Sequence, residues 1–403
     1  MLFSSRSKVS IALPFIVLLV LLAALMMSGI FRASAIHAAS DSHSGGFYRQ
    51  TNLVSDIAGM AKFTDPNLKN PWGISHSPTS PWWVSDNGTG LATLYKGDGT
   101  PFPVGSPLVV TIPPPAGSPA GTTAAPTGNV FNNVNSTNPN DFVVTANGKS
   151  GPSIFMFATE DGTISGWNPG VDPTNAILAK DRSTAVQGGF TGAVYKGLAT
   201  GQSNSKNFLY ATNFRFGQVE QFDADFKLVN TFTDPQLSSD CPIAGPPAQC
   251  FAPFGIQNIG GKLFVTFALQ NAEHHDDVAG PGNGFVDVFD TNGNLLQRLA
   301  SHGTLNSPWG LTLAPEGFGR FGKDLLVGNF GDGHINAFEP DTGAFRGQLQ
   351  GQGGSSNPIT IDDLWGLGFG NGANAGPTDT LFFTAGINDE ADGLFGSITK
   401  GEG

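Results

Sequence analysis

The side chains best suited to hold a metal ion or a polar ligand gather in one short segment, "QNAEHHDD" at 270–277. Glu273, His274, His275 and Asp276 offer the carboxylate and imidazole donors that Zn²⁺ and other divalent cations take in proteins. Neighbouring strand residues point to opposite faces, so both histidines could bind one ion only if the segment is a loop. The sequence leaves two interpretations open, a metal site and an ordinary solvated loop.

Asparagine recurs at the end of a strand-like segment in four places. The segments read "WWVSDN", "FVVTAN", "FLYATN" and "LLVGN", and they end at Asn87, Asn147, Asn213 and Asn329. Two further segments of this kind end at Ala268 and Gly386, and polar loops follow them, with Asn271 in one and Asn388, Asp389 and Glu390 in the other. If the strands lie in register, these side chains stand around one rim, where amide and carboxylate oxygens would suit Ca²⁺.

The asparagines also have a simpler interpretation. Asn hydrogen-bonds its own backbone and tolerates the left-handed region, so each one could cap the turn that follows its strand. A turn is needed in every repeat, whereas a binding site uses a few unlike residues. The repetition itself therefore favours turn capping over a ligand-binding ring.

Motifs of covalent catalysis do not occur in the sequence. The chain has no G-x-S-x-G, no phosphate-binding loop and no H-E-x-x-H. The acidic turns "GDGT" and "EDGT" lack the residue spacing of a calcium loop. We interpret them as hairpin turns, and the catalytic residues, if there are any, stay unknown.

A repeated unit must position these polar groups. The chain spells Trp-Gly-aliphatic or a close variant six times, with the glycines at 73, 128, 197, 255, 310 and 366. The spacing between successive glycines, with several strand-like segments in each interval, is typical of the blades of β-propellers. We expect each glycine on the innermost strand of a blade, where blades crowd and a missing side chain allows close approach. The aromatic residue before it would wedge between neighbouring blades as part of the core, as expected for Trp72, Phe254, Trp309 and Trp365.

The predicted fold is all-β, a six-bladed propeller of four-stranded blades that begin near 70, 126, 194, 252, 307 and 363. The last unit lacks a fourth strand, and an orphan strand lies at 47–56 before the first unit. Placing that strand on the outside of the last blade closes the ring and pairs an open edge. Residues 47–399 then form a single domain.

Composition narrows the classes of partner. The 403 residues carry a formal net charge of −12, which becomes −15 if Arg6, Lys8 and Arg32 are removed with residues 1–39. An acidic chain without a basic stripe is unsuited to phosphate backbones, so we expect no nucleic-acid partner. We expect a monomer.

The first 39 residues predict export. Arg6 and Lys8 precede an apolar run from Ile11 to Met27, and Ala33-Ser34-Ala35 resembles a cleavage site, as in a secretory signal peptide. The alternative is an uncleaved membrane anchor, since the run is nearly long enough to span a bilayer. Cys241 and Cys250 are the two cysteines of the chain, and in a secreted, extracytoplasmic protein we expect them to form a disulfide.

The repeat resembles a known group of propellers. The "PWG-aliphatic" start, the second strand and the aromatic residue before an acidic turn are similar to NHL-repeat propellers and to the wider six-bladed group of gluconolactonases and amidating lyases. A closer resemblance, carried by "FATEDGTISGWNP" at 157–169, is to a family of uncharacterised exported bacterial propellers. The resemblance covers about residues 47–399 and implies the fold. For lactonase-like relatives it implies metal ligands around one mouth of the channel.

Two functions follow as expectations. The first is an exported module that binds a small molecule or an extracellular protein. The alternative is a metal-dependent hydrolase or lyase of the lactonase type, with its site at the channel mouth and Ca²⁺ or Zn²⁺ as the possible metal.

Overall fold

The computed structural model describes residues 46–133, 138, 140–237, 241, 250–353 and 357–401. The predicted signal peptide or anchor at 1–39 lies outside these residues. Within them, no helix is long and apolar enough to cross a membrane. Among the named elements of the described part, η1 (Glu316–Phe321) is a 3₁₀-helix and all the others are strands, which turns and loops connect.

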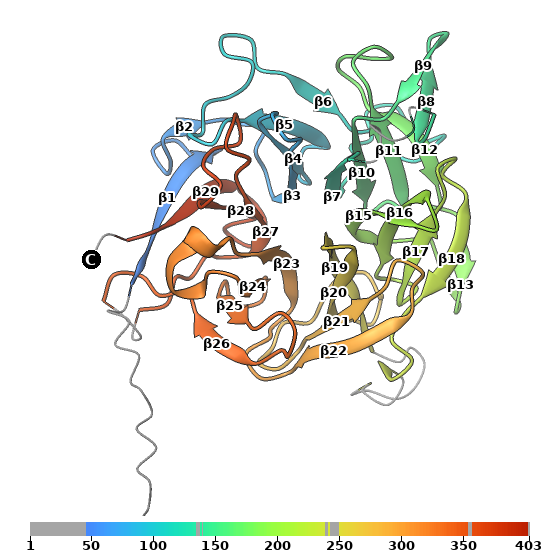
Figure 1. Ribbon diagram of the computed structural model, residues 1–403. Helices are drawn as coiled ribbons and strands as arrows, with labels where there is room; N and C mark the ends of the chain where they lie inside the picture. Colours follow the sequence, from blue (N-terminus) through green and yellow to red (C-terminus); the bar gives the residue numbers. More distant parts are fainter. Residues whose placement is uncertain are drawn as a thin grey trace, which may run out of the picture. The chain divides into compact units, whose positions relative to one another are not determined.

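Six small sheets follow one another around a common centre (Figure 1), antiparallel except for the short parallel pair of β1 and β2, which confirms the predicted propeller. Blade 1 contains β3 (Pro71–Ser75), β4 (Trp82–Asp86), β5 (Leu91–Tyr95) and β6 (Val109–Thr111). Blade 2 contains β7 (Pro126–Phe131), β10 (Phe155–Thr159), β11 (Thr163–Trp167) and β12 (Ile177–Asp181). Blade 3 contains β15 (Tyr195–Ser203), β16 (Lys206–Asn213), β17 (Gln218–Phe222) and β18 (Leu228–Phe232).

The remaining three blades keep the same order from the inside outwards. Blade 4 contains β19 (Phe251–Ile259), β20 (Lys262–Leu269), β21 (Phe285–Phe289) and β22 (Leu295–Ser301). Blade 5 contains β23 (Pro308–Leu313), β24 (Leu325–Asn329), β25 (Ile335–Phe338) and β26 (Phe345–Gln348). Blade 6 contains β27 (Leu364–Phe369), β28 (Leu381–Ala385) and β29 (Leu394–Lys400), and it ends with β1 (Tyr48–Ser55) and the short β2 (Phe63–Thr64).

The ring closes as the sequence predicted. Strand β1 pairs antiparallel with β29, from Tyr48 opposite Lys400 to Ser55 opposite Leu394. The pairing gives the last blade its fourth strand and covers an edge that would otherwise present unpaired backbone groups. Tyr48 also donates a hydrogen bond from its hydroxyl to the Phe318 carbonyl in η1, 3.1 Å away, which ties the closing strand to blade 5.

The inner glycines stand where neighbouring blades meet. A Cβ atom added to Gly73 would lie 2.6 Å from the Thr127 carbonyl oxygen, and one on Gly366 would lie 2.7 Å from the Trp72 carbonyl oxygen. The same contact recurs around the ring, with Gly255 against the carbonyl of Trp309. The glycines therefore fix how closely the inner strands can approach, as predicted.

The aromatic residues before these glycines are buried core residues, as predicted, but their rings pack against one another and do not wedge between blades. Trp72 and Trp365 stack with ring centroids 3.4 Å apart, and Trp309 meets them edge-on at 6.0 and 5.8 Å. Phe254 completes the group, 5.8 Å from Trp365. Residues on either side of an inner glycine alternate with it along the strand, so these rings converge at the axis as a buried aromatic plug.

The strand assignment within blade 2 also differs from the prediction. The segment at 142–147 is not the second strand, because β8 (Val143–Ala146) pairs with β9 (Lys149–Pro152) in a separate two-stranded hairpin. The turn is Asn147-Gly148, with both residues at positive φ, which is the pair that favours a two-residue hairpin turn. The true second strand is β10, which pairs with β7.

Replacing Gly255 tests the glycine ring. Gly255→Ala places a methyl group against the Trp309 carbonyl, so we expect the free energy of unfolding to fall by about 1–3 kcal/mol in chemical denaturation. Gly46→Ala, where nothing lies within 4 Å, is the control and should leave stability nearly unchanged. Equal stability of the two variants would contradict close approach at the axis.

Candidate functional site

One end of the channel collects polar side chains from five blades. Each inner strand starts at this end and its antiparallel partner returns to it, as Pro71 opposite Asp86 and Pro126 opposite Thr159 show. The residues just after the second strands therefore come together at what we call the acidic mouth. Asn87 in blade 1 and Glu160 in blade 2 occupy equivalent places there.

The floor of the acidic mouth is the aromatic plug with one lysine set into it. Lys196 precedes Gly197, the place where four other blades carry an aromatic residue, and its side chain is only 2% exposed. Its Nζ lies 4.9 Å from the ring centroid of Trp72 and 5.8 Å from that of Phe214. An ammonium over aromatic faces is stabilised by the negative potential of the rings.

An ion pair keeps this buried lysine charged. The Lys196 ammonium contacts Glu160 Oε1 and lies 3.7 Å from Asp276 Oδ1. Burial lowers the pKa of Lys196, but the negative charges of Glu160 and Asp276 outweigh it, so the net shift is upward. Removing either partner would leave an unbalanced buried charge.

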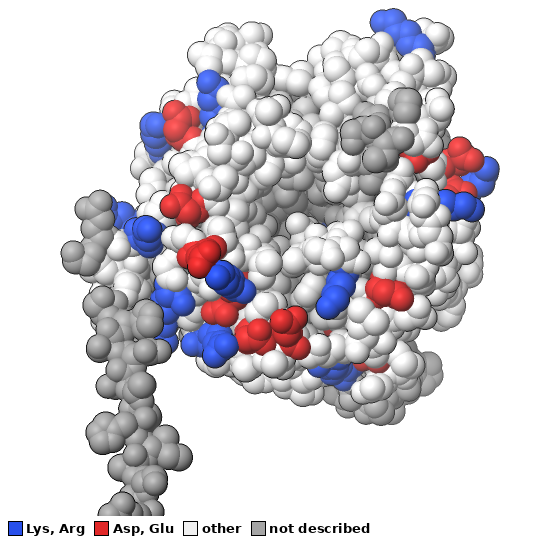
Figure 2. Space-filling model, in the orientation of Figure 1, with Lys and Arg blue, Asp and Glu red and all other residues white. Residues whose placement is uncertain are grey.

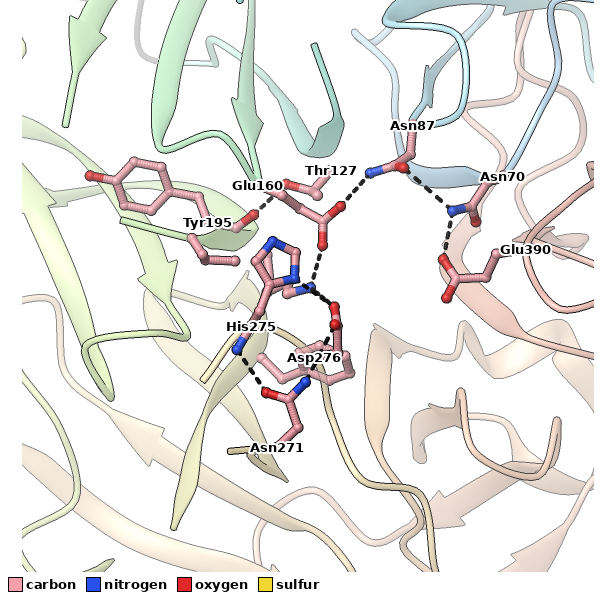
Figure 3. Close-up of polar contacts among 12 residues, drawn as sticks. Asn70, Asn87, Thr127, Glu160, Tyr195, Asn271, His275, Asp276 and Glu390 are labelled. Carbon is pink, nitrogen blue, oxygen red and sulfur yellow. Dashed lines mark hydrogen bonds and ion pairs between the residues drawn. The ribbon is translucent and has the colours of Figure 1, made fainter. Parts of the chain in front are cut away.

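A chain of hydrogen bonds extends from this ion pair along the rim (Figure 3). Asn87 donates to Glu160 Oε2 over 2.9 Å, and Asn70 donates to Asn87 Oδ1 over 3.4 Å and to Glu390 Oε2 over 2.6 Å. The indole N–H of Trp365 donates to Asn70 Oδ1 over 3.1 Å. The rim is thus held in place by the plug beneath it.

Blade 4 supplies the other side of the mouth. His275 Nδ1 lies 2.7 Å from Asp276 Oδ1, and Asn271 accepts a hydrogen bond from the His275 backbone N–H over 3.0 Å (Figure 3). The hydrogen bond from His275 and the charge of Lys196 lower the pKa of Asp276 against its desolvation. Asp276 is therefore ionised over the whole physiological range.

Three donor groups approach the geometry of a metal centre. One donor atom each from Glu160, His275 and Asp276 lie within 4.8 Å of one another. Imidazole and carboxylate suit Zn²⁺ and other divalent cations. However, the ammonium of Lys196 contacts Glu160 and lies near Asp276, so the protein's own cation already occupies part of their coordinating capacity.

Carboxylates outnumber cations at the acidic mouth. Desolvation raises the pKa of Glu390 to about 7, with the charge of Glu160 adding to the rise and the hydrogen bond from Asn70 opposing it. Desolvation and the charge of Asp362 raise the pKa of Asp363 to about 6. Burial also raises the pKa of Asp277. Burial is the main cause of these shifts, and repulsion from neighbouring carboxylates adds to each of them.

The structure does not assemble the four asparagines into one ring. Asn213 accepts hydrogen bonds from the backbone N–H groups of Val194 and Phe216, and it donates to Glu220, so it caps its own turn. Asn329 donates to Thr304 and Asp332. Both pair with the first residue of the inner strand of their blade, which is the place that Asp86, and not Asn87, holds in blade 1.

The other predicted residues also divide between the mouth and its surroundings. Asn147 sits in the outer hairpin turn, and His274 stacks on Phe190 with centroids 4.2 Å apart. Glu273 is exposed, as are Asn388 and Asp389, which adopt positive φ in a turn. Of the predicted set, the structure places Asn87, Asn271, His275, Asp276 and Glu390 in the network.

Sequence reasoning missed Asn70, Glu160 and Lys196. Lys196 could have been found, because it interrupts the series of aromatic residues before the repeated glycine. Glu160 could have been found only with the correct second strand in blade 2. The predicted disulfide is present, with Cys241 Sγ bonded to Cys250 Sγ.

The ion pair predicts non-additive mutational effects. Lys196→Met leaves Glu160 partly buried without its cation, so the free energy of unfolding should fall by about 3–5 kcal/mol in urea denaturation. The double variant Lys196→Met/Glu160→Gln should recover part of that loss. Lys323→Met, at an exposed ion pair with Glu316, is the matched control and should change stability little. A purely additive double variant would contradict a coupled pair.

The raised pKa of Glu390 predicts a pH effect on stability. The folded protein holds this proton more tightly than the unfolded chain, so the stabilising contribution is complete below pH 4.5 and is lost as the pH rises through about 7. The melting temperature of the wild type, relative to Glu390→Gln, should therefore decline across that window. The residue is partly exposed to solvent, so the effect should be modest. Glu316→Gln, at an exposed carboxylate, should show no such trend.

Comparison with protein-family models finds none that matches. Among solved structures, the streptogramin B lyase aligns with a TM-score of 0.48 and 13% identity over 90% of this chain and 100% of that one. A luciferin-regenerating enzyme aligns with a TM-score of 0.45 and 13% identity over 88% of this chain and 95% of that one.

Closer relatives come from a virus, whereas the resemblance led us to expect bacterial proteins. The uncharacterized protein L690 of Acanthamoeba polyphaga mimivirus is 29% identical over 351 residues, which cover 86% of this chain and 84% of the relative. The uncharacterized protein R648 of the same virus is 32% identical over 356 residues, covering 86% of this chain and 79% of the relative. The chain therefore belongs to the same family as protein R648.

Proposed function

We propose that the protein is a binding module whose ligand is a cation held at the acidic mouth. The observation that carries this proposal is the surplus of carboxylates there, namely Glu160, Asp276, Asp277, Asp363 and Glu390, over the two cations, the buried Lys196 and Arg215, whose charge interacts with Asp276. A site lined by one sign of charge raises the local concentration of ligands of the opposite sign.

The electrostatics supply a driving force for binding. Glu160 is engaged by Lys196 and Asn87. Asp363 and Glu390 have raised pKa values, chiefly because they are desolvated, and neighbouring carboxylates add to the rise at both. A cation placed beside them would favour their ionised forms. Binding should therefore release protons and strengthen as the pH rises through about 6 to 7.

The arrangement favours an organic cation over a bare metal ion. The unbalanced carboxylates come from blades 4 and 6, so the charge they present is spread along the rim. A flexible ligand with ammonium or guanidinium groups can bind carboxylates that lie apart along the rim. A divalent metal ion instead needs its oxygen ligands to converge on one point. The partner is then a small molecule, or an extracellular protein that presents Lys or Arg side chains.

A second candidate is a metal-dependent hydrolase or lyase. The proximity of donor atoms from Glu160, His275 and Asp276, all within 4.8 Å of one another, favours it. The bound metal would supply Lewis-acid chemistry at the mouth. In this second candidate, Glu160 must coordinate the metal while it also pairs with Lys196.

We also propose that the protein works outside the cytoplasm as a secreted monomer. Support comes from the signal-like residues 1–39 and from the disulfide between Cys241 and Cys250, since disulfides persist in oxidising compartments.

Thermal melts with and without cations test the proposal. Spermidine should raise the melting temperature of dialysed protein, because a ligand that binds the folded state stabilises it by about 2.7 kcal/mol at a hundredfold excess over Kd. Asp363→Asn/Glu390→Gln should abolish this shift, while Glu316→Gln, distant from the mouth, should keep it. No shift with spermidine, or an unchanged shift in the double variant, would refute the organic-cation site.

The same melts decide the second candidate. A shift with Zn²⁺ or Ca²⁺ that His275→Ala removes, and that a chelator reverses, would support the metal site over the organic cation. No metal in purified protein and no shift with either ion would exclude it.

A further inference from the structure

The opposite end of the channel has a different chemistry. All inner strands end there, so their last residues surround what we call the neutral mouth. Two adjoining cavities of about 640 and 470 Å³ open there and share Val130, Asn133 and Gln257. A narrow axial cavity, lined in part by Asn129 and Trp309, leads from the smaller one toward the aromatic plug.

The neutral mouth carries almost no charge. Among the described residues that line the two cavities, none is Lys, Arg, Asp or Glu, and His76 is the one titratable group. Figure 2 shows this face in the orientation of Figure 1, in which the labelled strands run clockwise around the centre. Figure 3 views the molecule from the opposite side, where the same blades run anticlockwise. Uncharged side chains surround the central hollow in Figure 2, and the charged side chains lie further out.

Polar groups without protein partners point to a ligand. Asn129 is only 6% exposed and donates to Gly73, Trp83 and Ser85, yet its Oδ1 has no hydrogen-bond partner. The buried hydroxyl of Ser75 lacks one as well. Both residues line the smaller cavity. Buried polar atoms are nearly always paired in folded proteins, so these two call for a donor or acceptor from outside the chain.

Further groups of the same kind come from other blades. Gln257 of β19 and Thr312 of β23 add an amide and a hydroxyl to the lining, and Gln257 is exposed. Phe131 of β7 and Phe369 of β27 add partly exposed aromatic rings. Five blades thus present neutral donors and acceptors beside apolar rings, the mixture that orients a small polar ligand in a pocket.

We propose that the neutral mouth binds an uncharged carbohydrate, a short chain of neutral sugars. Sugar hydroxyls both donate and accept, so they can satisfy the oxygens of Asn129 and Ser75 together with the amide of Gln257. The C–H faces of a sugar ring can pack on Phe131 and Phe369. A charged ligand would lose hydration here without meeting a counter-ion, which disfavours acidic sugars and charged peptides.

The site is independent of the proposed cation site. The aromatic plug and Lys196 separate the two mouths, and no residue is shared between them. Failure of one proposal therefore leaves the other standing.

Calorimetric titration of the full chain tests the carbohydrate site. The probes are maltotriose, cellotriose and triacetylchitotriose, and Trp82 in the cavity lining offers tryptophan fluorescence as a second readout. We expect at least one of the three to bind at millimolar concentration or better. Gln257→Ala and Thr312→Val should each weaken that binding by about three- to tenfold, since each removes one hydrogen bond.

Matched variants keep the test interpretable. Gln297→Ala, on the outer strand β22 of the same blade, should bind the sugar as the wild type does, and so should Glu390→Gln at the other mouth. Failure of all three sugars to bind, or binding unaffected by both Gln257→Ala and Thr312→Val, would overturn the proposal. Preference for glucuronic acid or for a neutral acetylated tripeptide amide over all three would also overturn it.

Discussion

The close approach of six inner strands around the axis is the constraint on which this structure depends. A side chain on Gly73, Gly255 or Gly366 would strike the backbone of the next blade. Hydroxyl groups then bridge the blades at the same level, as the Thr212 hydroxyl does by donating to the Phe254 carbonyl over 2.7 Å. With the strands this close, the aromatic residues before four of the glycines converge at the axis, whereas Thr127, before Gly128, donates to the Tyr195 carbonyl of the next blade.

The plug that results divides the channel into two mouths with opposite chemistry. Stacked rings of Trp72 and Trp365 close the middle, and the antiparallel course of each blade brings different strand ends to the two sides. The acidic mouth receives the turns after the second strands, where Glu160 and Asp276 lie. The neutral mouth receives the ends of the inner strands, where Asn129 and Gln257 lie.

Lys196 is the residue in blade 3 that replaces the aromatic residue of the repeat, and the polar network of the acidic mouth is built around it. At a position that is aromatic in four blades, it introduces an ammonium that is 2% exposed and must be balanced by Glu160. A buried ion pair of this kind contributes little net stability, but any alternative structure that buries one partner without the other is strongly disfavoured. The ion pair thereby holds Glu160 in position on the rim, and Asn87 and Asn70 continue the hydrogen-bond chain from Glu160.

The sequence alone determined the six blades, the closing strand, the glycines at the axis and the disulfide, because each depends on a local pattern that repeats along the chain or on a pair of nearby cysteines. It also singled out His275 and Asp276. Only the tertiary structure decided that Glu160, and not Asn147, lies on the rim. The strand before Asn147 pairs with β9 in a separate hairpin, so the inner strand β7 pairs with β10, which precedes Glu160. The same holds for the joining of Lys196 to Glu160 and Asp276 from other blades. Such contacts depend on how blades pack around the axis, and no periodicity within one blade specifies which side chains from different blades will meet.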